Sequence, residues 1–157
     1  MLFTFRLGSY LKSKKNIFAR FLLCFVYIFH LIHSRITGIQ IPIGTKVGKG
    51  LLFNHFGCIV LAGTVEIGDY CTVFQGVTIG RTWTDTAPPR IGNNCILSPG
   101  SKVIGEIKIG DRVIVGANSV VTKDIPSDCV VAGVPAKIIS TESKKYIQGQ
   151  WQKWLPM

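Results

Sequence analysis

The segment from residue 91 to residue 121 reads IGNNCILSPGSKVIGEIKIGDRVIVGANSVV, and an aliphatic residue returns in it at every sixth position. The same spacing extends back to residue 41 in two further runs. The thirteen positions, all apolar, are Ile41, Val47, Phe53, Ile59, Ile67, Val73, Ile79, Ile91, Leu97, Val103, Ile109, Val115 and Val121. A fixed short period over this length indicates a repeat architecture.

Six of these positions are followed directly by glycine, although glycine makes up only 17 of the 157 residues. A period of six matches neither an α-helix nor a long strand, but it suits very short strands joined by tight turns that glycine permits. Three such strands would close one triangular coil. The inward side chains of successive coils would then stack about 4.8 Å apart.

This repeat resembles that of the hexapeptide-repeat acyltransferases, and AGVPAK at residues 132–137 resembles the sequence that closes their last coil. The resemblance implies a mainly β fold: a left-handed parallel β-helix over residues 39–138, interrupted by a loop at 81–90. We expect a helical segment at 1–38 before it and a helix within 139–157 after it. The latter would carry Tyr146, Trp151, Trp154 and Leu155.

The charge and the cysteines limit the classes of partner and site. Lys and Arg total 18 against 8 Asp and Glu, so an anionic partner or simple solubility explains the net charge of +10. Nucleic acid is not expected, because no binding motif and no interleaved aromatic residues accompany the cations. Five cysteines without CxxC spacing predict neither a zinc site nor a disulfide framework, and they favour a reducing cytoplasm.

The first forty residues differ in kind from the repeat. Basic residues precede an uninterrupted apolar run of nine, residues 21–29, which is shorter than the roughly 20 needed to span a bilayer. A signal peptide is possible in outline, but no clear small-residue cleavage site follows. Two interpretations stay open: a helical cap packed on the coils or on a partner subunit, and a helix lying on the cytoplasmic membrane face. His30 and His33 are expected to be ordinary packed histidines.

The candidate catalytic residue lies in GLLFNHFGCIV, residues 50–60. Together with QGVTIG at residues 75–80, this segment resembles the serine acetyltransferase branch, in which a Leu-Asp-His sequence supplies the catalytic histidine. The resemblance implies that His55 is the general base and acetyl-CoA the acyl donor. His55 is also the lone histidine of the repeat, so the histidine ligand set of the zinc carbonic anhydrases with this fold cannot form, and no metal is expected.

The chemistry needs a residue of this type. A hydroxyl group is a poor nucleophile at neutral pH, and a neutral imidazole can take its proton while the oxygen attacks a thioester; the protonated ring can then protonate the departing sulfur. Such catalysis contributes about 10²- to 10⁴-fold, and alignment and oxyanion donors supply the rest.

Three departures from the branch bear on the acceptor. Asn54 replaces the Asp before the histidine, Gln40 replaces the carboxylate fifteen residues upstream, and Pro88 stands where a substrate-holding histidine is expected. We therefore expect a sugar hydroxyl of a capsular or exopolysaccharide as acceptor, with Gln40 and Asn54 supporting His55. Serine is the alternative acceptor, and a non-catalytic β-helix scaffold is the third hypothesis.

The remaining expectations concern binding and assembly. In the loop, Trp83, Asp85 and Arg90 are candidate acceptor contacts, although a plain solvent loop is an equal interpretation for each. By resemblance, a pantetheine groove and cations for the CoA phosphates would involve Ser98, Pro99, Gly100, Gly116, Ala117, Ser119, Lys123 and Lys137. A homotrimer with sites between adjacent subunits is also implied, since its interfaces would bury flat apolar coil faces.

Overall fold

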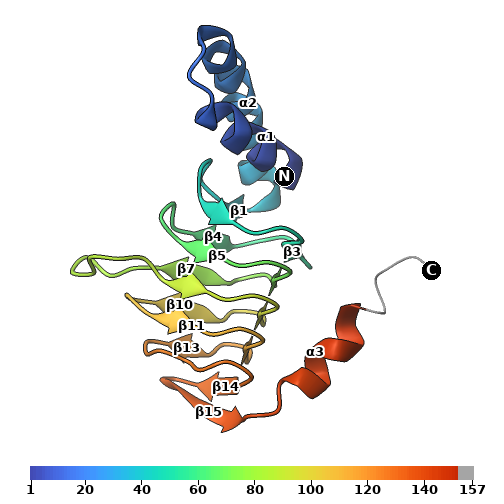
Figure 1. The fold of residues 1–157 in the computed structure, drawn as a ribbon, viewed down its shortest axis with the longest axis vertical. Helices are drawn as coiled ribbons and strands as arrows, with labels where there is room; N and C mark the ends of the chain where they lie inside the picture. Colours follow the sequence, from blue (N-terminus) through green and yellow to red (C-terminus); the bar gives the residue numbers. More distant parts are fainter. Residues whose placement is uncertain (152–157) are drawn as a thin grey trace.

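The chain folds into a triangular stack of five coils that carries a helical hairpin at one end (Figure 1). The computed structural model describes residues 1–151, with side chains through residue 147. The coil strands, in chain order, are β1 (Ile39–Gln40), β2 (Lys46–Val47), β3 (Leu52–Phe53), β4 (Ile59–Leu61), β5 (Glu66–Ile67), β6 (Thr72–Val73), β7 (Thr78–Gly80), β8 (Arg90–Ile91), β9 (Ile96–Leu97), β10 (Lys102–Ile104), β11 (Lys108–Ile109), β12 (Ile114–Val115), β13 (Val120–Val121) and β14 (Val130–Gly133).

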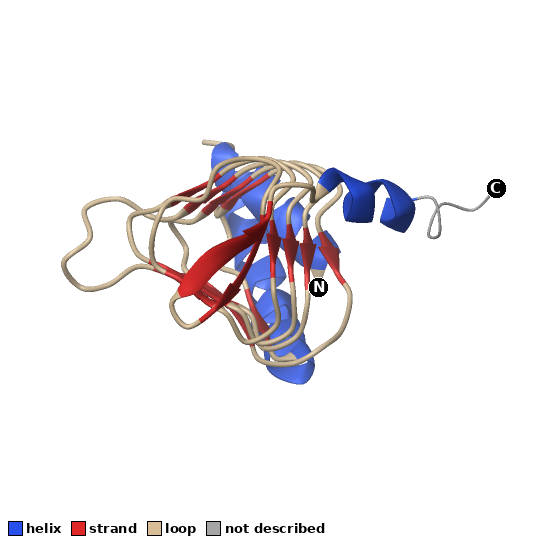
Figure 2. Ribbon diagram, turned by 90° about the horizontal axis from the view of Figure 1, so that it is seen from below, coloured by secondary structure: helices blue, strands red, loops and turns tan. Residues whose placement is uncertain are grey.

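Each strand stacks on the strand three positions earlier in the chain, which gives three parallel sheets. The sheets follow the orders β1-β4-β7-β10-β13, β2-β5-β8-β11 and β3-β6-β9-β12-β14, and Figure 2 shows them as the sides of a triangle. A last strand, β15 (Ala136–Ser140), turns back antiparallel on β14 and ends the third sheet. The expected left-handed parallel β-helix is confirmed.

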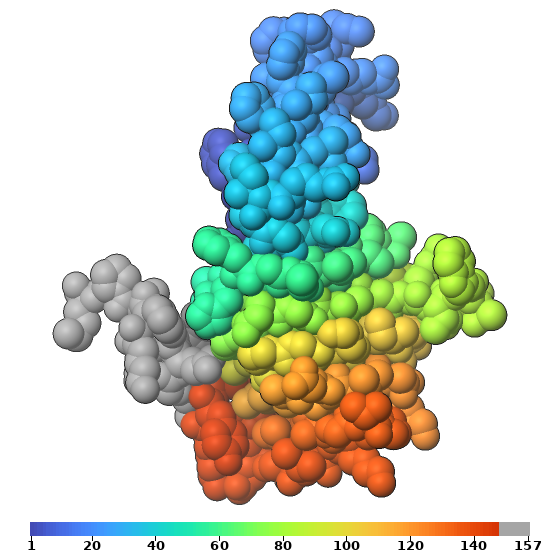
Figure 3. Space-filling view, turned by 180° about the vertical axis from the view of Figure 1, so that it is seen from behind, coloured from blue at the N-terminus to red at the C-terminus, as the bar shows by residue number. Residues whose placement is uncertain are grey.

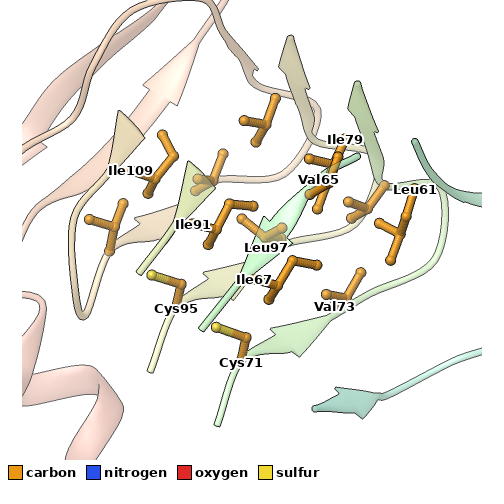
Figure 4. Packing of buried hydrophobic residues seen from close by; sticks show 14 of the residues in the cluster. Leu61, Val65, Ile67, Cys71, Val73, Ile79, Ile91, Cys95, Leu97 and Ile109 are labelled. Carbon is orange, nitrogen blue, oxygen red and sulfur yellow. The ribbon is translucent and has the colours of Figure 1, made fainter. Parts of the chain in front are cut away.

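The interior is filled by the repeat positions. Eleven of the thirteen are buried, while Val47 and Phe53 in the first coil are half-buried. Ile67, Ile91 and Ile109 come from three successive coils and point into the same core, where Cys71 lies beside Cys95 (Figure 4).

One part of the predicted phase is wrong. Leu61, rather than Ile59, is in register with Ile79, while Ile59 pairs with Ile39 of the first coil. Both Ile59 and Leu61 are buried, so apolarity alone did not distinguish them. The interval from Phe53 to the next inward repeat position, Leu61, is therefore eight residues instead of six, and the two extra residues lengthen the loop between β3 and β4.

A ladder of side chains fixes the turns between the second and third strands of each coil. Asp69 Oδ1 accepts from the Lys49 amide at 2.8 Å, and Asn93 Oδ1 accepts from the Asp69 amide at 2.8 Å. Asp111 Oδ1 accepts from the Asn93 amide at 2.7 Å, and the Ser127 hydroxyl oxygen accepts from the Asp111 amide at 2.9 Å. Glycine precedes Asp69, Asn93 and Asp111, and a side chain has no room there, because a Cβ on Gly68 would lie 2.7 Å from the Gly92 carbonyl carbon.

The N-terminal segment forms two helices, whereas one helical segment was expected. They are α1 (Leu2–Ser13) and α2 (Ile17–Thr37), and the Asn16 side chain caps α2 by accepting from the Ala19 amide at 2.7 Å. The two helices form an antiparallel hairpin that stands on the first coil (Figures 1 and 3). His30 is buried and donates through Nε2 to the Ile41 carbonyl at 2.8 Å, which ties α2 to that coil.

The C-terminal helix α3 spans Lys144–Trp151 and leaves the last coil on the side of the third sheet. Ser143 is buried and its hydroxyl donates to the Arg112 carbonyl, while Arg112 pairs with Asp128 at 2.6 Å. Ile147 is buried and Tyr146 is exposed. The Trp151 side chain, Trp154 and Leu155 lie outside the described residues and side chains.

Candidate active site

The lengthened loop presents His55 to solvent. Residues 54–58 leave β3 and return to β4, and the Gly57 amide donates to the Thr37 carbonyl at 2.9 Å. Gly57 and Cys58 both have positive φ values, 100° and 53°, which turn the backbone sharply. His55 and Phe56 are consequently exposed at a corner of the triangle, as the sequence predicted for His55.

Two neighbours orient the His55 ring. The Asn54 amide nitrogen Nδ2 lies 3.3 Å from His55 Nε2, and the ring of Phe74 lies with its centroid 6.0 Å from the imidazole centroid. With Asn54 donating, Nε2 is the unprotonated ring nitrogen, which is the form that a general base requires. The geometry therefore brings Asn54 to His55, and its supporting role stays a prediction.

Below His55, the same corner of each later coil forms a continuous edge. The amides of Asn54, Phe74, Ser98 and Gly116 donate in turn to Val73, Leu97, Val115 and Val131 at 2.8–3.1 Å, so these four residues stack on one another. The turns that follow them stack in the same way, which places Pro99 and Ala117 on the edge beneath His55. Four expected cofactor contacts, Ser98, Pro99, Gly116 and Ala117, thus share one corner with His55.

A groove of 290 Å³ runs along the adjoining sheet. It is lined by Phe74, Ile96, Ser98, Ile114, Val130 and Tyr146. Its walls are apolar apart from the Ser98 and Tyr146 hydroxyls, and its first residue, Phe74, is the one in ring contact with His55. Such a groove suits a thin, mostly apolar chain.

Gly100 and Lys102 complete this corner. Gly100 has a φ of 72°, in the left-handed region that favours glycine, and a Cβ there would also displace the Asn118 side chain. The Lys102 ammonium donates to the carbonyls of Gly76 and Gly100, both at 2.7 Å. Lys102 and Phe74 were not predicted from the sequence, because each occupies an ordinary outward position of the repeat.

Three expected cofactor contacts lie elsewhere. Ser119 is buried, and its hydroxyl oxygen accepts from the Gly133 amide at 3.0 Å, so it holds the coil together and does not line the groove. Lys123 follows β13 at a different corner, the one from which the loop after β7 projects. Lys137 lies on β15, opposite Ala132 of β14.

Gln40 is not joined to His55 by any hydrogen bond in the described part of the chain. It is exposed on β1 and lines a cavity of 540 Å³ together with Arg35, Ser34 and His30. Within a single chain, Gln40 therefore makes no hydrogen bond that would support His55.

The loop at 81–90 projects from the corner between the first two sheets, away from His55 (Figures 1 and 2). Trp83 is fully exposed near its tip, and Asp85 accepts from the Thr82 amide at 2.5 Å. Glu106 anchors the loop by accepting from Thr86, and this hydrogen bonding lowers the pKa of Glu106.

Arg90 lies on β8 rather than in the loop and pairs with Glu66 at 3.5 Å. A single chain therefore does not bring Trp83, Asp85 or Arg90 to His55. Within the described residues, no group of three or more His, Cys, Asp or Glu side chains is arranged to hold a metal ion.

Comparisons with known proteins agree with this arrangement. Residues 88–123 match the family described as bacterial transferase hexapeptide (six repeats). The chain is 42% identical over 106 residues to a serine acetyltransferase of Synechococcus elongatus, which covers 66% of the chain and 43% of the relative. It is 43% identical over 108 residues to that of Staphylococcus aureus, covering 68% of the chain and 51% of the relative.

Solved structures point the same way. A Brucella abortus serine acetyltransferase in complex with coenzyme A superposes with a TM-score of 0.78 at 29% identity, over 90% of this chain and 55% of that one. The chain belongs to the hexapeptide-repeat acyltransferases, on their serine acetyltransferase-like branch. It spans about half the length of the relatives that it matches.

The expectation of a sugar acceptor is wrong. It depended on Gln40, Asn54 and Pro88 of this chain, whereas the relatives and the structural neighbour above are named serine acetyltransferases. Of the three exchanged residues, Asn54 contacts His55 and Gln40 makes no hydrogen bond with it. These exchanges are weaker evidence about the acceptor than 42–43% identity over more than a hundred residues.

Proposed function

We propose that this hexapeptide-repeat protein is an acetyl-CoA-dependent serine O-acetyltransferase. The observation that carries the proposal is the position of His55, which is exposed, held by Asn54 and set at the head of an apolar groove. The names of the relatives and the coenzyme A bound to structural neighbours support both the acceptor and the donor.

In the proposed reaction, Nε2 of His55 takes the proton of the serine hydroxyl as its oxygen attacks the thioester carbonyl carbon. The tetrahedral intermediate then collapses, the carbon–sulfur bond breaks, and the proton on Nε2 passes to the departing sulfur. The products are O-acetylserine and free CoA. Asn54 orients the ring by donating its amide to Nε2 until the acceptor replaces this contact.

The donor would lie along the corner beneath His55. The pantetheine arm fits the apolar groove beside Ser98, and the small residues Gly100, Gly116 and Ala117 leave room for it on the adjacent edge. This placement puts the thioester beside His55 and the CoA phosphates toward the last coils, where Lys137 lies on β15.

We also propose a cyclic trimer as the working unit, located in the cytoplasm, where acetyl-CoA is available. In one chain the loop carrying Trp83 and Asp85 lies at a different corner from His55. A neighbouring subunit, placed with its loop against this corner, would supply the missing wall of the site. Gln40 lies on the first sheet and would then contact the neighbouring subunit or the acceptor.

The acceptor is tested by following loss of the acetyl-CoA thioester with serine, with threonine and without acceptor. A dye for free thiols is unsuitable, because Cys24 and Cys58 of the protein are exposed. We expect turnover with serine at least tenfold above the no-acceptor rate, and formation of O-acetylserine by mass spectrometry. Equal rates with and without serine would contradict the proposal.

A further inference from the structure

The helix α2 presents an apolar face to solvent. Nine large apolar side chains, each 39–83% exposed, make up this outward face: Ile17, Phe18, Phe21, Leu22, Phe25, Ile28, Phe29, Ile32 and Ile36. At about 100° per residue they fall within an arc of about 140°. From Ile17 to Ile36 the only residue of that arc that is not apolar is Arg35, at its edge, and Phe21 and Phe25 pack edge to face at 5.0 Å.

The opposite face of α2 is the one that packs inside the protein. Ala19, Val26 and His30 are buried there, and His30 reaches both Thr4 of α1 and the first coil. A helix on the surface of a soluble domain usually turns polar side chains outward. Since α2 is apolar on both faces, its outward face indicates an apolar partner.

The charge distribution identifies that partner. Residues 1–65 contain 8 Lys and Arg and no Asp or Glu, so the other 92 residues hold 18 − 8 = 10 basic and all 8 acidic residues. Two copies of so positive a segment repel one another, whereas an anionic lipid surface attracts them. We propose that the outward face of α2 lies in the interface of an anionic phospholipid bilayer.

The hairpin lies in the membrane plane and does not cross it. By length and composition α2 is sufficient to span a bilayer. However, its N-terminal end adjoins the hairpin tip, where Lys12, Lys14, Lys15 and Arg20 gather, and a crossing would draw these cations through the hydrocarbon. The companion helix α1 has only 12 residues, about 18 Å, against the roughly 30 Å of hydrocarbon.

In the planar arrangement the cations reach the headgroups while the apolar face enters the acyl boundary. The contact would hold the coil stack at the membrane without using any residue of the His55 corner.

The test is flotation of the full chain with vesicles of phosphatidylcholine alone and of phosphatidylcholine containing about a third phosphatidylglycerol. We expect at least tenfold stronger partition into the anionic vesicles, weakened by salt. The variant Phe21→Asp/Phe25→Asp should lose roughly 100-fold or more of this partition. Lys14→Ala/Lys15→Ala should lose about 30-fold.

The matched control is Ile138→Asp/Ile139→Asp, which changes two exposed apolar residues on β15 and should partition within twofold of the wild type. Circular dichroism and thioester turnover confirm that each variant is folded. Absent wild-type flotation with anionic vesicles, or flotation unchanged by Phe21→Asp/Phe25→Asp, overturns the proposal. A wild-type oligomer that the same variant dissociates would also overturn it and assign the face to a protein contact.

Discussion

The ring centroids of His55 and Phe74 lie 6.0 Å apart, so the candidate base rests on the first residue of the apolar groove. The two residues belong to successive coils, and Phe74 stacks beneath Asn54 on the same edge. This contact joins the part of the site that performs proton transfer to the part that would hold the acyl donor.

Replacing Phe74 tests that connection. In Phe74→Ala the imidazole loses its packing partner and the groove loses an apolar wall. We expect about a tenfold loss or more in kcat/KM, from both a higher KM for acetyl-CoA and a lower kcat. Phe56→Ala, which removes an exposed ring from the same loop, is the control and should change kcat/KM less than threefold. Similar effects of the two substitutions would contradict a role for Phe74.

A mixing experiment tests whether the site is shared between subunits. His55→Ala and Trp83→Ala/Asp85→Ala should each be weakly active alone. If one subunit supplies His55 and its neighbour the loop, random reassembly of equal amounts leaves about one quarter of the sites intact. Activity near that fraction of wild type is expected. Recovery no greater than the average of the two variants would place the whole site in one subunit.

The core repeat has a measurable effect on stability. Leu97 is fully buried at the middle of the stack, so Leu97→Ala removes packing from the coils on both sides. We expect the free energy of unfolding to fall by about 2–5 kcal/mol in urea titrations. Ile139→Ala, at a side chain that is 65% exposed, should stay within about 0.5 kcal/mol of wild type. A small loss at Leu97 would contradict the assigned stacking.

The attachment of α3 depends on pH. Hydrogen bonds from Arg112 at 2.6 and 2.9 Å hold the pKa of Asp128 below its usual value. Because the pKa is lowered by folding, the stabilisation is present above the unfolded value, about 3.9, and is lost as pH falls through the folded pKa.

Hydrogen exchange at the Ile147 amide should therefore accelerate as the pH falls below about 4, beyond its intrinsic pH dependence. In Asp128→Asn, exchange should already be fast at neutral pH and show no further acceleration. Identical profiles for the two proteins would exclude this ion pair as the anchor of α3.

The repeat made most of the fold predictable. Buried side chains such as Val73 and Leu97 lie at the expected spacing of six residues per repeat, because each short strand must place one apolar residue inside. The slip between Ile59 and Leu61 was not predictable, since both are apolar and only the pairing of the coils decides which one stacks. That slip creates the loop on which His55 is presented.

A motif marked part of the candidate site in the sequence. The structure places Asn54 against His55 and Ser98 on the same edge, and their roles stay predictions. Gln40 and Trp83 were assigned by resemblance, and the single chain places Gln40 on the first sheet and Trp83 at a different corner from His55. The acceptor could not be predicted from the residues of the site alone either.

The sequence alone did not predict which face of α2 is exposed. Phe25 and Val26 are adjacent in one apolar run, yet one is exposed and the other buried. Composition gives the hydrophobicity of such a helix but not the side that its neighbour covers.

The most direct test of the account is the rate of serine-dependent thioester loss from acetyl-CoA in wild type and His55→Ala, with acetyl-CoA binding measured by calorimetry in both. His55 is in ring contact with Phe74 but is not among the residues that line the groove, so the variant should bind acetyl-CoA within about threefold of wild type. Its kcat should fall by about 10²- to 10⁴-fold, the contribution of a general base. Retention of wild-type kcat in a variant that still binds acetyl-CoA would contradict the assignment of His55 as the base.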